Sequence, residues 1–183
     1  MILKERMTIY HGSYVPIEEP ILQMCRSRKD FGKGFYLTTD YEQAKRFTAA
    51  SINKAIAEGR IDSNHNMGYI SAYELGSVSD INCFEFKAAD EEWLRCVVNH
   101  RKETEDISRW EKYDIIAGKI ANDNTNFVIT AYIRGAYGDV KSRDAISTAI
   151  RLLLPERLKD QICLRTDEAI SKIIYQGYEE VTL

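Results

Sequence analysis

Two short motifs near the start of the chain bring together residues that could contact a ligand. The first is His11-Gly12-Ser13, and the second reads Phe31-Gly32-Lys33-Gly34-Phe35-Tyr36. An imidazole can donate or accept a hydrogen bond, and a neighbouring glycine lets a ligand approach backbone N–H and C=O groups that can pair with an amide. A single histidine at a strand end is more often structural than catalytic, so the first motif is suggestive only beside the second.

The second motif has to be compared with the glycine-rich loops that bind phosphate. A P-loop requires G-x-x-x-x-G-K-[ST], whereas Phe35 follows Gly34 here. A dinucleotide fingerprint requires a third glycine at a position that holds Leu37. Taken alone, the glycines therefore indicate a tight turn before a strand.

Aromatic and basic side chains surround the same turn. Phe35 and Tyr36 are neighbours in a strand candidate, so their side chains point to opposite faces. We expect one of them to pack and the other to face a cleft. Four cations lie beside the turn, and they either belong to a solvated loop or form a binding site for a phosphate group. They are Arg26, Arg28, Lys29 and Lys33.

Other common catalytic patterns are missing from the sequence. There is no G-x-S-x-G elbow and no H-E-x-x-H motif. His65, in a polar loop, and His100, near a helix end, are expected to be solvated. The cysteines form no C-x-x-C pair and have no histidine at metal-ligand spacing, so we predict no metal site and reduced, mostly buried thiols. They are Cys25, Cys83, Cys96 and Cys163.

Alternating short strands and helices must position these residues. Asp40 is expected to cap a helix with Gln43 as its capping-box partner, and Ser142 and Thr166 to begin two later helices. Arg101 closes a helix that opens with acids near residue 90, which suits the macrodipole. Strands are expected over residues 7–10, 35–38, 69–75, 81–86, 113–116 and 161–165. Long Val/Ile runs of buried parallel strands are missing, which favours the α+β class.

The bulk composition indicates one globular domain over residues 1–183. The chain is 44% hydrophobic and 29% charged, and no linker or repeat divides it. A formal net charge of −3 does not favour extensive binding to nucleic acid or anionic membrane. No apolar run approaches the ~20 residues that span a bilayer, and the N-terminal segment lacks a signal-peptide pattern. We therefore expect a cytoplasmic protein with no membrane contact.

Together, the two motifs resemble those of the ADP-ribosyltransferase superfamily, in its poly(ADP-ribose) polymerase-like and diphtheria-toxin-like branch. His11-Gly12 resembles the first motif of that branch, and residues 31–36 resemble its second, F-G-K-G-aromatic/aliphatic-Tyr. Phe47 lies eleven residues after Tyr36, where the family carries a second aromatic residue. Gln161 looks equivalent to the third-motif residue, which is usually Glu. The chain is also similar to an uncharacterised bacterial family of this superfamily, often encoded beside a small partner.

The resemblance implies a split antiparallel β-sheet core with flanking helices and NAD as co-substrate. The nicotinamide ring would stack between Tyr36 and Phe47, its carboxamide would pair with the backbone of Gly12, and His11 would bond a ribose hydroxyl. The catalytic residues that it implies are His11, Tyr36 and Gln161. The NAD-binding residues that it implies are His11, Gly12, Ser13, Phe31, Gly32, Lys33, Gly34, Tyr36 and Phe47.

Two residues depart from the family pattern. Gln161 carries no charge where Glu stabilises the cationic ribose, and losing such stabilisation costs roughly 2–4 kcal/mol of barrier. Asp160 would supply a carboxylate only in a different strand register, because strand geometry points it to the opposite face. Ala44 replaces a hydroxyl residue that touches the nicotinamide amide, and Ser13 is a candidate to compensate.

The function implied by the resemblance is mono-ADP-ribosyl transfer. The nicotinamide–ribose bond of NAD would be cleaved and ADP-ribose transferred to a protein or nucleic-acid acceptor. A toxin-like effector held by a cognate antitoxin protein is a related expectation. Gln161 keeps two alternatives open, which are a catalytically silent NAD- or ADP-ribose-binding module and an NAD glycohydrolase.

Overall fold

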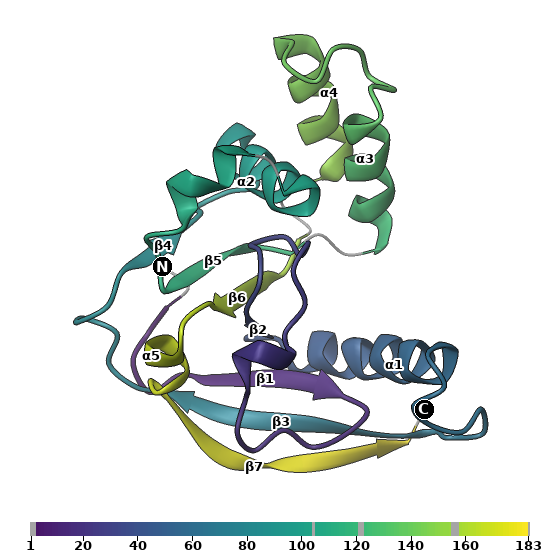
Figure 1. Ribbon diagram of the computed structural model, residues 1–183, viewed down its shortest axis with the longest axis vertical. Coiled ribbons are helices and arrows are strands. Elements are labelled where there is room, and N and C mark those ends of the chain that lie inside the picture. Colours follow the sequence, from purple (N-terminus) through teal and green to yellow (C-terminus); the bar gives the residue numbers. More distant parts are fainter. Residues whose placement is uncertain (1–2, 104, 121–122, 155–157, 183) are drawn as a thin grey trace.

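The computed structural model describes residues 3–103, 105–120, 123–154 and 158–182, and it combines helices with two β-sheets (Figure 1). The helices are α1 (Tyr41–Ala57), α2 (Glu91–Lys102), α3 (Asp123–Ile133), α4 (Arg143–Leu153) and α5 (Asp167–Ile170), with 3₁₀ helices η1 (Leu22–Met24) and η2 (Glu105–Trp110). The strands are β1 (Thr8–Ser13), β2 (Phe35–Leu37), β3 (Met67–Leu75), β4 (Cys83–Glu85), β5 (Ile115–Lys119), β6 (Asp160–Leu164) and β7 (Ile173–Thr182). The expected α+β class is confirmed.

The strands form two sheets that meet at a single point. Sheet A has the order β1-β3-β7 and sheet B the order β2-β6-β5-β4, and only the pair of β4 and β5 is parallel. The N–H of Tyr10 donates to the C=O of Thr38 at 2.8 Å, and the N–H of Thr38 donates back at 3.0 Å. Because β1 and β2 form no further pair, the edge of β1 beyond Tyr10 is left open.

Apolar side chains fill the layers between these elements. The space between the sheets holds Ile9 and Tyr73 of sheet A against Phe35 and Ile162 of sheet B. The other face of sheet B packs against α2, and α4 and α3 continue this apolar cluster outward, with α4 against α2 and α3 against α4 (Figure 1). The other face of sheet A contacts α1 around Ala44. The layers therefore run from α1 through sheets A and B to the three helices.

The helix starts follow from their capping residues. The side chain of Asp40 accepts from the N–H of Gln43 at 2.8 Å, and Ser142 and Thr166 cap α4 and α5 in the same way. The expected capping box is only half formed, because the amide of Gln43 donates to the C=O of Asp160 at 3.4 Å. Burial of Gln43 against β6 thus replaces the return bond to the cap.

Strand β7 is the largest element that the sequence did not predict. It is mostly exposed, so its sequence lacks a clear apolar face. Its pairing with β3 shifts register between Ala72 and Tyr73, opposite Gly177, whose φ is +120°. This bulge leaves one residue, Gln176, without a partner across the ladder. The segment between α2 and β5 contains η2, where the sequence predicted no helix.

Helix length and composition bear on membrane contact. Within the described ranges, no helix is both long enough and apolar enough to cross a bilayer. Figure 1 shows α3 and α4 as a helical pair that stands away from both sheets. Both helices are 11 residues long, which is well short of the ~20 residues of a bilayer span.

Gly12 lies where β1 crosses α1, and its small size sets the distance between them. A Cβ placed on Gly12 would be 1.9 Å from the carbonyl oxygen of Ala44 and 2.7 Å from Oγ1 of Thr48. Gly12→Ala therefore has to push α1 off the sheet, and we expect it to lower the free energy of unfolding by about 3 kcal/mol. Urea unfolding measures this change. Thr39→Ala, at an exposed position just before α1, is the control, and equal stability of the two variants would contradict the packing role.

Candidate functional site

His11 joins the ends of β1 and β2. Its ring stacks on Phe35 with centroids 4.5 Å apart, and its Nδ1 lies 2.8 Å from the C=O of Tyr36. A carbonyl only accepts, so Nδ1 carries the proton and Nε2 keeps a lone pair. Burial lowers the pKa of His11, although the bond to Tyr36 acts in the opposite direction. The folded protein therefore favours a neutral imidazole with Nε2 as an acceptor.

The backbone of Gly12 lies on the open edge of β1. Along an antiparallel strand, the N–H and C=O groups of alternate residues point to the same side. Tyr10 directs its pair toward Thr38, so Gly12, two residues later, directs its pair away from β3 as well. Within the described chain no group bonds to this donor and acceptor. Such a pair matches the N–H and C=O of a primary carboxamide. Ser13 ends the strand and is buried.

The second motif is a turn that is fixed by the Tyr36 hydroxyl. That hydroxyl accepts from the N–H of Phe31 at 2.9 Å and donates to the C=O of Gly32 at 2.8 Å. Gly32 has a φ of +82°, which favours glycine. At position 34, glycine is required because of close packing, since a Cβ there would lie 2.4 Å from Sγ of Cys163. The motif thus forms the tight turn before a strand that its glycines indicated.

The other residues of the expected NAD site divide between core and surface. Phe31 is fully buried and stacks on Phe86 with ring centroids 5.7 Å apart, so its side chain packs the core. Lys33 is exposed in the turn. The ring of Tyr36 is half-buried, and Phe47 projects from α1 with 40% of its surface exposed. A large aromatic ring at this exposure is available to stack on a ligand.

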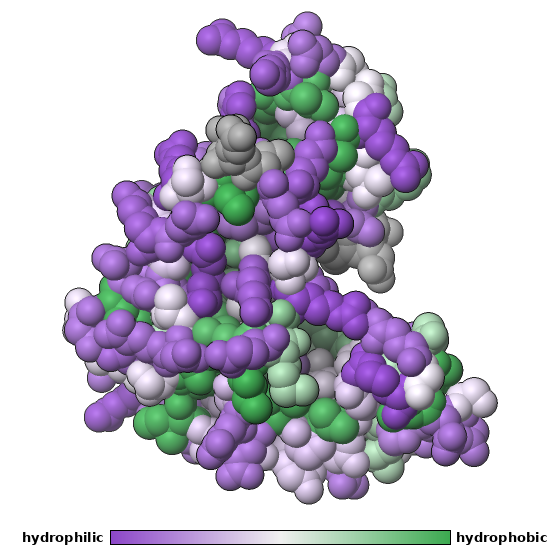
Figure 2. Space-filling model, in the orientation of Figure 1, coloured by the Kyte–Doolittle hydropathy of each residue, from purple (hydrophilic) through white to green (hydrophobic). Residues whose placement is uncertain are grey.

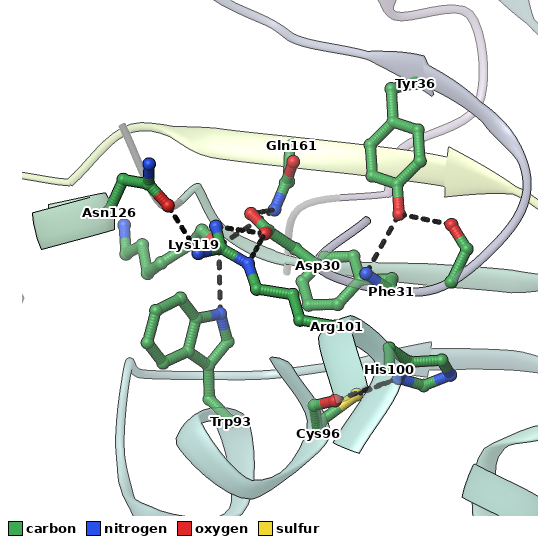
Figure 3. A network of polar contacts seen from close by, with 11 residues as sticks. Asp30, Phe31, Tyr36, Trp93, Cys96, His100, Arg101, Lys119, Asn126 and Gln161 are labelled. Carbon is green, nitrogen blue, oxygen red and sulfur yellow. Dashed lines mark hydrogen bonds and ion pairs between the residues drawn. The ribbon is translucent and has the colours of Figure 1, made fainter. Parts of the chain in front are cut away.

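Gln161 of β6 is held by two acceptors in a buried polar network (Figure 3). Its Nε2 donates to Oδ2 of Asp30 at 3.0 Å and to the C=O of Lys119 at 3.3 Å. Because both partners accept, the amide nitrogen faces the network, and Figure 3 shows the amide oxygen turned away from Asp30. Among the residues that the structure describes, nothing bonds to this oxygen. Gln161 therefore presents one acceptor atom outward.

Asp30 organises this network, and sequence reasoning did not single it out. Its Oδ1 accepts from Nε and Nη2 of Arg101 at 2.9 and 2.6 Å, with the two side chains only 10% and 17% exposed. Arg101 also donates to Asn126 at 2.7 Å, and the indole of Trp93 donates to the C=O of Lys119 at 2.9 Å. The only signal in the sequence was an acid directly before the second motif.

His100 is buried, which corrects the expectation that it is solvated. Only 4% of it is exposed, because its position in the last turn of α2 directs the ring against Gly32. Its Nδ1 donates to the C=O of Cys96 at 2.9 Å, and its Nε2 has no partner among the described residues. Burial lowers the pKa of His100. The neutral ring of His100 thus packs against the turn of the second motif at Gly32.

Asp160 does not replace the third-motif carboxylate. Strand alternation directs it away from Gln161, and its carboxylate pairs with Nζ of Lys119 at 2.9 Å. Its C=O accepts from the hydroxyl of Thr38 at 3.0 Å. The register of β6 is therefore the one that strand geometry predicts, with Asp160 serving to fasten β6 to its neighbours.

The cysteines are poorly suited to nucleophilic chemistry. Burial raises the pKa of Cys163 to about 12 and that of Cys83 to about 11, and it also raises those of Cys25 and Cys96. A thiol that holds its proton near neutral pH is a weak nucleophile. All four cysteines are free, as expected, and two of them are buried. No group of three or more metal-binding side chains occurs within the described ranges.

The surface is hollowed at more than one place. Figure 2 shows an indentation between α1 and the helical layer. A separate shallow hollow of about 450 Å³ lies between α2 and α4, lined by Glu91, Arg143, Ile146, Ser147, Ile150 and Arg151. The lining of this second hollow includes neither a residue of the two motifs nor Gln161. The motifs are the candidate site because His11 contacts Tyr36 there and the open backbone edge of Gly12 lies directly beside this contact.

Comparison with known proteins identifies a family whose function is unknown. Residues 7–175 match the model of a family described as "Protein of unknown function (DUF3990)". The matched segment includes both motifs, Asp30 and Gln161. No curated protein matches the chain.

Gln161→Glu restores the residue type that the family resemblance leads one to expect, yet we predict that it destabilises the protein. The new carboxylate would face the carboxylate of Asp30 and the C=O of Lys119 without a donor. We expect a loss of about 2 kcal/mol or more in the free energy of unfolding, measured in urea at pH 7.5. In an Asp30→Asn background, where an amide can donate to the new carboxylate, the same Gln161→Glu change should cost less than it does in the wild type. An unchanged stability of the single variant would contradict the network.

His11 and His100, whose pKa values are both lowered by burial, predict that stability falls on acidification. Their pKa values lie below the ordinary 6.5, so the unfolded chain binds more protons and stability is fully present only above about pH 6.5. Urea midpoints should therefore decrease from pH 7.5 to 5.0. His11→Asn combined with His100→Asn keeps a side-chain donor at both places and should flatten this decrease. Parallel pH profiles of variant and wild type would argue against the assignment.

Proposed function

The chain belongs to the DUF3990 family, whose function is unknown, and we propose that it is an NAD-dependent mono-ADP-ribosyltransferase that acts in the cytoplasm. It cleaves the nicotinamide–ribose bond of NAD and transfers ADP-ribose to a protein or nucleic-acid acceptor. One observation carries the proposal. At the junction of the two sheets, just beyond the bridge between Tyr10 of β1 and Thr38, His11 contacts Tyr36 of β2, and the backbone edge of Gly12 beside it is open. Two sheets that meet at one bridge support a split core of the ADP-ribosyltransferase type.

The described residues fit the parts of NAD in turn. The N–H and C=O of Gly12 match the carboxamide of nicotinamide, and the rings of Tyr36 and Phe47 offer faces for stacking. Nε2 of His11, with its lone pair, can accept from a ribose hydroxyl. The amide oxygen of Gln161 is a second acceptor for a ribose hydroxyl. Donors and acceptors thus occur in the combination that this dinucleotide requires.

The reaction breaks one C–N bond and forms one bond to the acceptor. The bonding electrons leave with the nicotinamide nitrogen, positive charge builds on the ribose, and the acceptor attacks and loses a proton. Asp30 acts as a positioning residue, because it holds the NH₂ group of Gln161 and so directs the amide oxygen outward. An amide oxygen stabilises a cation less than a carboxylate does, so we expect turnover roughly 10²–10³-fold slower than with a carboxylate.

A silent NAD-binding module is the second candidate, and Gln161 is the observation that favours it. Its amide carries no net charge, and its nitrogen is fully engaged by Asp30 and Lys119. Binding without cleavage would need only the Gly12 edge and the aromatic rings. Hydrolysis of NAD, with water as the acceptor, is the third outcome of the same site.

A toxin-like effector with a cognate antitoxin protein extends the first proposal. Depletion of NAD or modification of an essential acceptor would slow growth of a bacterial host on strong expression. His11→Ala should relieve that effect. Growth that is indifferent to expression of the wild-type chain would remove the basis for this extension.

Nicotinamide release from NAD by the purified protein is the test of the proposed function. We expect release by the wild type and an at least tenfold lower rate for His11→Ala and Tyr36→Ala, because each removes a group at the junction. His65→Ala and Tyr178→Ala are matched controls outside it and should keep the wild-type rate.

The acceptor dependence separates the three candidates. Release that rises with bacterial lysate supports a transferase, and release without lysate supports hydrolysis or self-modification. NAD binding by calorimetry with no release at any enzyme concentration would favour the silent module. Full activity of both junction variants would overturn the site assignment.

A further inference from the structure

Four cations gather near the C-terminal end of α1, and two of them pair with the carboxylate of Glu58. Oε1 of Glu58 pairs with Arg26 at 2.5 Å, and Oε2 pairs with Arg60 at 2.7 Å. Lys54, one turn before Glu58, and Lys29 complete the group, and neither forms an ion pair with a described residue. Four positive charges and one negative charge leave +3 at this place, in a chain whose formal net charge is −3.

The arginine at the centre of this group is held in place by its neighbours. Arg60 donates to the hydroxyl of Tyr14 at 2.5 Å, and its guanidinium lies 4.7 Å from the centre of the Tyr14 ring. Tyr14 is in turn fixed to α1, because its N–H donates to Oγ of Ser51 at 3.2 Å. A cation that is oriented in advance loses little freedom when it binds an anion.

The charges repel one another in the absence of a ligand. Lys54 is half-buried, and its pKa is lowered first by burial and then by Lys29 and Arg26, with only Glu58 acting against them. The helix macrodipole favours cations near a C-terminus by about 0.3–1 kcal/mol, but only within the last turn. It does not account for Arg26 and Lys29, which come from the segment before the second motif. An anion bound among the four would remove the repulsion.

The cluster lies within reach of the proposed nicotinamide site. Lys54 follows Phe47 by seven residues on α1, which places both on the same face of the helix. Two turns correspond to about 10.5 Å along the axis.

We propose that Arg26, Lys29, Lys54 and Arg60 form a binding site for a diphosphate group. Arginine offers paired donors to phosphate oxygens, and lysine adds a point charge. The group comes either from a dinucleotide co-substrate, in which case this inference rests on the proposed function, or from a separate phosphorylated ligand. Arg28 stands outside the site, because its partner Glu103, at 2.7 Å, lies at the end of α2 and not at the end of α1.

Binding of inorganic pyrophosphate, followed by calorimetry at low salt, tests the site. The variant is Lys29→Gln combined with Lys54→Gln, which removes two charges and breaks no ion pair of the described residues. We expect its Kd to be at least tenfold higher than that of the wild type. Lys45→Gln combined with Lys87→Gln removes the same charge at exposed positions elsewhere and should leave the Kd unchanged. Absence of binding by the wild type, or equal Kd values for all three proteins, would overturn the proposal.

Thermal unfolding separates ligand binding from a structural role. Without ligand, the Lys29/Lys54 variant should unfold at the wild-type Tm or above it, because repulsion is relieved. Pyrophosphate should raise the Tm of the wild type and not that of the variant. A variant that unfolds well below the wild type without ligand would show that the lysines stabilise the fold, and it would count against the proposal.

Titration with ADP-ribose distinguishes the two sources of the diphosphate. Weaker binding of both pyrophosphate and ADP-ribose by the variant supports a dinucleotide, whereas weaker binding of pyrophosphate alone supports a separate ligand. His11→Ala should bind pyrophosphate as the wild type does. A wild type that binds pyrophosphate but releases no nicotinamide would thus refute the proposed activity and leave the diphosphate site standing.

Discussion

The carboxylate of Asp30 connects three parts of the molecule that are distant in sequence. One oxygen accepts two bonds from Arg101 at the end of α2, and the other accepts from Gln161 on β6. Asp30 itself precedes the turn of the second motif, so these bonds fasten that turn over sheet B. Removing one member of such a buried ion pair costs about 3–5 kcal/mol. The position of Tyr36, and through it that of His11, depends on this attachment.

Local signals in the sequence predicted the helix starts, most strands and the class of the fold. Asp40, Ser142 and Thr166 cap helices because each acts on an N–H three residues away. The pairing of Asp30 with Gln161, 131 residues apart, has no local signal. The inward turn of His100 likewise depends on which face of α2 meets Gly32. Strand β7 escaped prediction because it is exposed and so lacks an alternating apolar pattern.

The residues of the two motifs also stabilise the fold, in addition to any role in binding. Gly12 permits the contact of β1 with α1, and Gly34 permits the contact of the turn with Cys163. Phe31 fills the core with its ring and supports the Tyr36 hydroxyl with its N–H. The contacts proposed for the ligand are therefore made by groups that these structural roles do not occupy, namely the backbone N–H and C=O of Gly12, Nε2 of His11 and the amide oxygen of Gln161.

The two edges of sheet A differ in what they offer to another chain or ligand. At β7 the bulge opposite Ala72 and Tyr73 twists the strand, and Glu179 and Glu180 are exposed along it. Bulges and charges of this kind discourage the addition of a further strand. The opposite edge, on β1, is closed by Thr38 at Tyr10, and within the described residues the N–H and C=O of Thr8 and of Gly12, on either side of this bridge, have no partner strand. Because the bridge interrupts this six-residue strand, the β1 edge offers separate single N–H and C=O pairs to a ligand and no continuous row to a further strand.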